Sequence, residues 1–139
     1  MIEDIGKLLL RLGVGGLMLF HGIDKALHGI TFIEGMLTAH DIPPIVTYGV
    51  YIGEIAAPIL LILGLFTPLA ALAIIINMVI AILLVYADAI FSVTQHGAWS
   101  IEVPMLYLVQ ALAILILGPG RYSLDERIFS HRSDTPGSR

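Results

Sequence analysis

Residues 48–65 read YGVYIGEIAAPILLILGL, an apolar run long enough for a membrane-spanning helix, and it contains one carboxylate, Glu54. A spanning helix needs about 20 residues to cross a hydrocarbon layer of about 30 Å. A charged side chain at mid-membrane costs roughly 2.5 to 3.5 kcal/mol on insertion scales, and such residues usually face a bundle interior, a partner or a wet cavity. Glu54 is therefore the first candidate functional residue of the chain.

The backbone at Glu54 is also unusual, because Pro58 follows four residues later. Proline has no N–H, so the carbonyl of Glu54 loses its helical hydrogen-bond partner. We expect a kink at this point. We also expect the freed carbonyl to line a cavity or to find another partner, because a bilayer offers no water.

The rest of the chain has the composition of an integral membrane protein. Of its 139 residues, 58% are hydrophobic and 13% are charged, whereas soluble domains carry about 25% charged residues. The length fits one membrane domain, residues 1–125, followed by a polar tail, residues 126–139, whose stretch from Ser133 to Arg139 we expect to be disordered. Cysteine is absent, which excludes disulfides, thiolate metal sites and dithiol redox chemistry.

Four apolar segments predict an all-α fold, an integral membrane four-helix bundle. They are approximately Ile5–Leu27, Val46–Leu65, Leu69–Tyr86 and Ile101–Leu117. We expect the first segment to be a span rather than a signal peptide, because charged residues lie within its apolar pattern and no small-residue cleavage site follows.

Several residues mark the ends and contacts of these helices. Thr67 followed by Pro68 is typical of a helix start, and Ser100 is a candidate cap for the last span. Between the first two spans, apolar residues at helical spacing predict a short amphipathic helix on the membrane surface. These residues are Phe32, Ile33, Met36 and Leu37. Glycines in the first span, Gly13, Gly15 and Gly16, predict close packing against a neighbouring helix.

The distribution of basic residues predicts the orientation of the bundle. Lys and Arg are enriched near the cytoplasmic ends of spans. Six of them fall on the side of the termini, namely Lys7, Arg11, Arg121, Arg127, Arg132 and Arg139. Only Lys25 belongs to the other side, so we expect both termini to be cytoplasmic.

This topology brings the polar residues of the spans toward one leaflet. Glu54 lies about eight residues into its span, which corresponds to a depth of roughly 12 Å. His21, Asp24 and Lys25 are spaced i, i+3 and i+4 in the first span and share one helix face. Glu102 begins the fourth span from the same side, where it could simply offset the positive helix end.

Each of these residues has a structural explanation as well as a functional one. Lys25 and Asp24 could be interfacial, and His21 could be a hydrogen-bonded packing residue. Glu54 could form an ion pair with Lys25 or a hydrogen bond to His21 that holds the bundle closed, or it could bind a ligand and handle protons.

The remaining polar residues predict mainly structural roles and no metal centre. We expect Asn77 and Gln110 to join helices by hydrogen bonds, and Arg11 to anchor to inner headgroups or pair with the polar tail. Bis-histidine haem needs two histidines on facing helices, and only His21 lies clearly inside a span. No HExxH or CxxC pattern is present, so we assign no metal ligands.

With these residues in place, the chain resembles the DoxX family of small four-helix bacterial inner-membrane proteins. The resemblance covers nearly everything from Leu8 to Asp125. The stretches that carry it are Leu10-Arg11-Leu12 with His21-Gly22 and Lys25, Gly53-Glu54 through Leu63-Gly64-Leu65-Phe66-Thr67-Pro68, and Gly118-Pro119-Gly120-Arg121-Tyr122-Ser123-Leu124-Asp125. It implies a multi-pass protein of the bacterial inner membrane.

The resemblance also implies a redox setting. The family is named for the membrane subunit of a thiosulfate to quinone oxidoreductase, and other members are associated with oxidative or thiol stress and with catechol or quinone resistance. Lys25, Glu54 and Glu102 fall on recurrent polar positions of the family, and His21 on a frequent one.

The leading hypothesis is a quinone-linked redox protein or the membrane subunit of an oxidoreductase complex. His21, Lys25, Glu54 and Glu102 are the candidate quinone-binding residues, and Glu54 and His21 are the candidate catalytic residues because they could exchange protons. No flavin, haem or iron-sulfur motif is visible in the sequence, so a partner protein would have to supply electrons.

Two other hypotheses remain open. The first is a non-catalytic membrane scaffold or assembly subunit whose polar cluster stabilises the bundle. The second is a small solute or proton carrier, which would act as a dimer because four spans form at most half of a pathway. In all three cases the main partner is the lipid bilayer, and nothing in the sequence points to nucleic acid.

Overall fold

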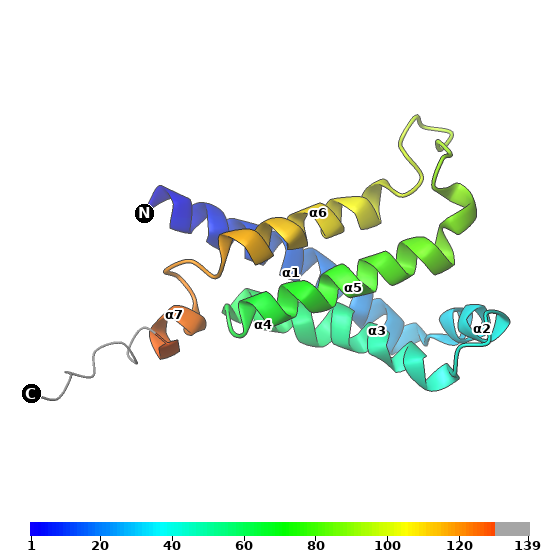
Figure 1. The fold of residues 1–139 in the computed structure, drawn as a ribbon, viewed down its shortest axis with the longest axis horizontal. Helices are drawn as coiled ribbons and strands as arrows, with labels where there is room; N and C mark the ends of the chain where they lie inside the picture. The colour runs from blue at the N-terminus through cyan, green and yellow to red at the C-terminus, as the bar shows by residue number, and fades with distance from the viewer. Residues whose placement is uncertain (130–139) are drawn as a thin grey trace, which may run out of the picture.

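The structure is a computed structural model that describes residues 1–129 and shows long helices lying roughly side by side (Figure 1). The long elements are α1 (Ile2–His28), a composite helix of residues 44–63, α5 (Thr67–Val85) and α6 (Glu102–Leu117). α1 and α5 each pack against both α4, the last part of the composite helix (Ala57–Leu63), and α6, so the four elements form a closed ring. Between residues 1 and 129 the extended structure is limited to one bridge, Val93 to Trp99.

Three of these helices are long and apolar enough to cross a membrane by length and composition: α1, the segment Pro44–Leu63, and α5. α6 is apolar but has only 16 residues, which extend about 24 Å at 1.5 Å per residue. An all-helical membrane bundle is thus confirmed, with three clear spans and a shorter fourth helix. The sequence placed all four segments correctly, with ends that differ from the observed ones by three residues or fewer.

The composite helix changes its winding along its length. It begins as the 3₁₀ segment η1 (Pro44–Tyr48), continues as one turn of α-helix, α3 (Gly49–Tyr51), widens into the π-helical turn η2 (Ile52–Ala56) and ends as α4. Figure 1 shows this helix running beside α5.

The π-helical turn contains Glu54 and lies directly before Pro58. The N–H of Ala57 bonds to the carbonyl of Ile52, five residues back. Such widened turns occur where the regular helical ladder is interrupted, and they are frequent at functional sites. The disturbance expected from Pro58 therefore takes the form of a local widening around Glu54.

Two glycines of α1 let the composite helix approach closely. A Cβ atom at Gly22 would lie 2.1 Å from the carbonyl oxygen of Glu54, and one at Gly15 would lie 2.8 Å from the carbonyl oxygen of Pro58. The freed carbonyl of Glu54 thus faces the backbone of α1, where no side chain stands in the way. The predicted close packing is confirmed for Gly15, but Gly13 and Gly16 have open space around them.

The starts of α5 and α6 differ from the sequence prediction. The capping residue of α5 is Asp125, whose carboxylate accepts hydrogen bonds from the N–H groups of Phe66 at 2.7 Å and Thr67 at 2.8 Å. Thr67 already lies within the helix, and its buried hydroxyl has no partner among the described residues. Ser100 was also the wrong cap, because α6 begins after Ile101 and the Ser100 hydroxyl pairs with Ser92.

Arg11 completes the corner around Asp125. It is 1% exposed and donates to the carbonyl of Tyr122. Its guanidinium lies over Gly64, whose carbonyl in turn accepts the N–H of Asp125 at 2.8 Å. Anchoring of Arg11 to headgroups was therefore a wrong prediction, whereas its pairing with the C-terminal segment is confirmed. The reason is that this segment folds back onto the α4–α5 turn and covers the arginine.

The short elements lie at opposite ends of the bundle (Figure 1). α7 (Leu124–Phe129) lies at the end with the N-terminus, and α2 (Thr31–Ala39) lies at the other end, together with η3 (Ala87–Ala89) and the loop that leads to α6. The predicted short helix between the first two spans is confirmed. The tail from residue 130, including the stretch expected to be disordered, lies outside the described residues.

We predict that Gly64→Ala destabilises the bundle by about 2 kcal/mol or more. Gly64 has a φ of 66°, a left-handed conformation that costs other residues roughly 1 to 2 kcal/mol. An added Cβ would also lie 1.7 Å from Nη1 of Arg11. Chemical unfolding of the purified protein in detergent measures the effect. Gly13→Ala is the control, and equal stability of the two variants would contradict the proposed tight corner.

Candidate functional site

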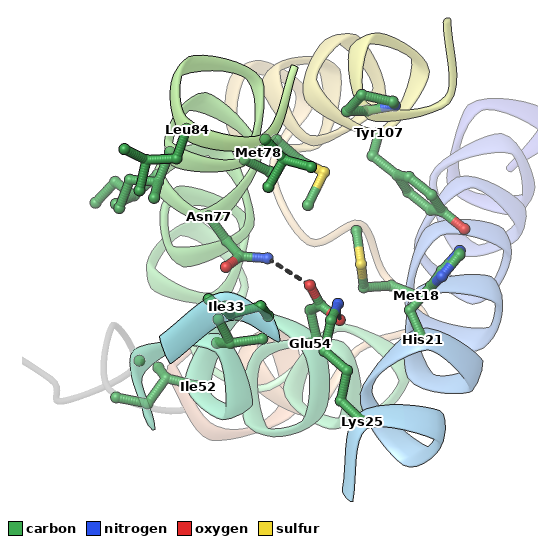
Figure 2. Close-up of a pocket in the computed structure, with 18 of the residues that line it drawn as sticks. Met18, His21, Lys25, Ile33, Ile52, Glu54, Asn77, Met78, Leu84 and Tyr107 are labelled. Atoms are coloured by element: carbon green, nitrogen blue, oxygen red, sulfur yellow. Dashed lines mark hydrogen bonds and ion pairs between the residues drawn. The ribbon is translucent and has the colours of Figure 1, made fainter. Parts of the chain in front are cut away.

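A cavity of about 480 Å³ lies between the helices at the end of the bundle that carries α2, and Figure 2 shows it from close by. Side chains from α1, α2, the composite helix, α5 and α6 line it, and most of them are apolar. The volume falls within the range of about 300 to 1,000 Å³ that is typical of small-molecule sites.

The six polar side chains of the lining come from four elements. They are His21 and Lys25 of α1, Glu54 of η2, Asn77 of α5, Tyr86 at the end of α5, and Tyr107 of α6. Figure 2 shows five of them arranged around a common space. Polar groups that converge in a mostly apolar pocket are typical of ligand sites.

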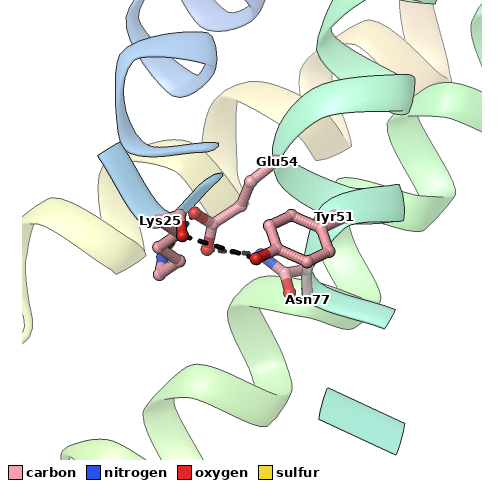
Figure 3. A network of polar contacts seen from close by, with 4 residues as sticks. All are labelled: Lys25, Tyr51, Glu54 and Asn77. Carbon is pink, nitrogen blue, oxygen red and sulfur yellow. Dashed lines mark hydrogen bonds and ion pairs between the residues drawn. The ribbon is translucent and has the colours of Figure 1, made fainter. Parts of the chain in front are cut away.

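Glu54 is at the centre of a hydrogen-bonded network (Figure 3). Its Oε2 accepts from Nζ of Lys25, and its Oε1 accepts from Nδ2 of Asn77 at 3.2 Å. The carboxylate side chain is 6% exposed and the Lys25 side chain 27% exposed. Tyr51 supports the network from outside the cavity by donating to the backbone carbonyl of Lys25 at 3.4 Å. The predicted ion pair between Glu54 and Lys25 is therefore confirmed.

Small residues beside Glu54 allow this network to form. A Cβ at Gly53 would lie 2.6 Å from Cβ of Asn77. The missing side chain lets α5 come close enough for Asn77 to reach the carboxylate. Gly22 plays the same part on the other side, where α1 carries Lys25. Glu54 therefore lies between α1 and α5, which both pack closely against the π-helical turn that carries it.

His21 and Tyr107 form a second polar group at the edge of the cavity between α1 and α6. Their rings meet edge to face, with centroids 5.9 Å apart and planes at 88°. The hydrogen bond from His21 to Glu54 that we considered from the sequence is not present between these residues. His21 is instead packed against an aromatic ring, with its nitrogens free in the described structure.

α2 forms one wall of the cavity. Ile33, Met36 and Leu37 line it, and Leu37 is only 3% exposed. The sequence predicted that this apolar face would lie on the membrane surface. The structure turns part of it inward, because the chain folds back between α1 and the composite helix. Phe32 also lines the cavity yet remains largely exposed.

The structure brings together three of the four predicted site residues. His21, Lys25 and Glu54 all line the cavity. Glu102 is exposed at the start of α6, outside the lining, and its side chain forms no hydrogen bond or ion pair within residues 1–129. Asp24 is also outside the lining and pairs with His28, at 2.9 Å on the protein surface.

The sequence did not predict that Asn77 and Tyr107 belong to the site. Asn77 was expected to join helices, which is confirmed, but its partner is the central carboxylate of the site. Tyr107 was not singled out at all, although a tyrosine far from the ends of an apolar helix is unusual, because tyrosines gather at membrane interfaces. Gln110 makes no hydrogen bond through its side chain within residues 1–129, so that expectation was wrong.

One comparison with known proteins identifies a family. The model of the DoxX family matches residues 6–87. An uncharacterized protein of Haemophilus influenzae is 33% identical over 88 residues, which is 63% of this chain and 56% of that protein. The aligned region thus spans little more than half of the relative. No solved structure matches the chain.

We predict that Lys25→Met costs more stability than Glu54→Gln. Removing the ammonium leaves a buried carboxylate with only Asn77 as partner, and breaking a buried pair in this way costs about 3 kcal/mol or more. Glutamine keeps the shape of Glu54 and the contact to Asn77, while the partly exposed Lys25 can turn toward the membrane surface. Unfolding of both variants and the double variant in detergent tests this, and strictly additive losses would contradict the coupling.

Proposed function

The chain belongs to the DoxX family, and on this premise we propose that it is a quinone-binding membrane protein that serves as the membrane subunit of an oxidoreductase complex. Its role would lie in the response to oxidative or thiol and sulfur stress. The observation that carries the proposal is the apolar cavity with His21, Lys25 and Glu54 gathered in its wall.

The chemistry of a quinone fits this lining. A quinone is a flat apolar ring with two carbonyl oxygens, so its site needs apolar walls and a few hydrogen-bond donors. The cavity supplies apolar side chains from five elements, and Lys25 and His21 supply donors. Lys25 uses one of its three N–H donors on Glu54, which leaves others for a ligand oxygen.

Reduction of a quinone converts two carbonyl groups into hydroxyl groups and consumes two electrons and two protons. We assign proton transfer to Glu54 and His21, the carboxylate and the imidazole of the lining. The electrons would come from a redox centre on a partner protein, because the sequence carries no flavin, haem or iron-sulfur motif.

The orientation is also part of the proposal. Lys7 lies near the start of α1, and Arg121 and Arg127 lie just before and within α7, at the end of the bundle with the N-terminus, whereas Lys25 is paired with Glu54 in the cavity. The positive-inside rule then favours four spans with both termini in the cytoplasm of a bacterium. In this orientation the cavity lies in the outer leaflet of the inner membrane, and protons exchange with the outer side.

A second candidate function is a membrane scaffold whose polar cluster locks the helices. One observation favours it: both carboxylate oxygens of Glu54 already have protein partners, Lys25 and Asn77. In a dry interior such a satisfied network stabilises one arrangement of helices. The two functions differ in whether a ligand occupies the space beside the network.

We predict that quinone extracted with the purified wild-type protein will be lost from Glu54→Gln, while the variant still folds. Absorbance and mass analysis of the organic extract measures the bound quinone, and unfolding in detergent measures stability. Glu102→Gln is the matched control, because that carboxylate is exposed and lies outside the cavity. Loss of stability without any quinone in the wild-type extract would favour the scaffold.

We also predict that single cysteines will report the orientation, because the chain contains none of its own. A membrane-impermeant maleimide added to intact spheroplasts should label Gln95→Cys in the exposed loop before α6. Arg121→Cys should be labelled only after the cells are broken. The reverse pattern would contradict cytoplasmic termini.

A further inference from the structure

We infer that Tyr107 is a ligand-contacting residue of the cavity and that it donates a hydrogen bond to an oxygen atom on the edge of a bound planar ring. This inference rests on the proposed function, since the ring is that of the quinone. It adds a contact from α6, the helix that contributed only Glu102 to the predicted site. His21, beside Tyr107, is the second group at this contact.

The hydroxyl of Tyr107 is free to form a hydrogen bond. Its side chain is 9% exposed, yet its hydroxyl makes no hydrogen bond in the described part of the chain. The hydroxyl is not among the fully enclosed polar atoms that lack a partner, so it keeps some exposed surface, and Tyr107 is one of the residues that line the cavity. Burying such a group without a partner is costly. A ligand oxygen would remove that cost.

The polar groups of the cavity differ in whether they already have hydrogen-bond partners in the protein. Both carboxylate oxygens of Glu54 already accept hydrogen bonds. His21 and Tyr107 make only an edge-to-face ring contact with each other, and their polar atoms have no hydrogen-bond partner within residues 1–129. Figure 2 shows Tyr107 and His21 on one side of the cavity and Asn77 on another. A ring with oxygens at its two opposite ends suits such an arrangement, because one oxygen meets Tyr107 and the other meets the cluster around Lys25.

Two methionine side chains in the cavity favour a flat ligand ring. Met18 from α1 and Met78 from α5 line the cavity, and Figure 2 shows their sulfur atoms pointing into the space between the helices. Thioether sulfurs make favourable contacts with aromatic and other flat π-systems, and methionine adapts its shape to a ligand. These two walls favour a flat ring over a branched aliphatic ligand of the same volume.

The test compares two ligands on the purified full-length protein in detergent. One is a benzoquinone with a decyl tail and the other is decylbenzene, which has the same tail and a ring without oxygen. Tyr107→Phe removes the hydroxyl and keeps the ring contact with His21. The matched control is Tyr122→Phe, which removes a hydroxyl from a half-exposed tyrosine that lies outside the cavity lining.

We expect Tyr107→Phe to weaken binding of the decyl benzoquinone about five- to tenfold, as for the loss of one hydrogen bond. Binding of decylbenzene should remain within twofold, and Tyr122→Phe should change the binding of neither ligand. Equilibrium dialysis gives the dissociation constants, and size-exclusion elution confirms that each variant is folded.

Three results would overturn the inference in distinguishable ways. Unchanged quinone binding in Tyr107→Phe would remove Tyr107 from the site and leave the proposed function standing. Equal weakening of both ligands would show that Tyr107 acts by packing and not by hydrogen bonding. Failure of the wild-type protein to bind the decyl benzoquinone would overturn the proposed function together with the inference.

Discussion

A carboxylate among apolar helices must find its partners within the protein, and the bonding of Glu54 to Lys25 and Asn77 is the interaction on which the bundle depends. It joins α1, the composite helix and α5 at one level. Close approach at Gly22 and Gly53 is what makes it geometrically possible. The π-helical turn before Pro58 is the backbone form that carries the carboxylate to this place.

Charged side chains at the other end of the bundle also find their partners within the protein. There the C-terminal segment folds back, Asp125 caps α5, and Arg11 is buried beside Gly64. This end is held by hydrogen bonds between side chains and backbone, and the cavity there is smaller, about 310 Å³. The larger of these two cavities, with its cluster of polar side chains, lies beside Glu54, and for this reason we place the binding chemistry there.

The sequence predicted the helices and part of the site because those features depend on local or one-dimensional properties. Apolar length located the four helices, and the cost of a charge in lipid identified Glu54 with its partner Lys25. Thr67 and Arg11 were assigned wrongly because their surroundings come from residues more than 55 positions away. Tyr107 was missed because a free hydroxyl is visible only when its neighbours are known.

The sequence by itself determined that this chain forms apolar helices in a membrane and that a carboxylate among them must be paired. The period and length of the apolar pattern are sufficient for that conclusion. Only the tertiary structure decided which groups share a space, because glycine contacts and the return of the C-terminal segment set the helix positions. It placed Asn77 and Tyr107 in the cavity with Glu54 and left Glu102 outside.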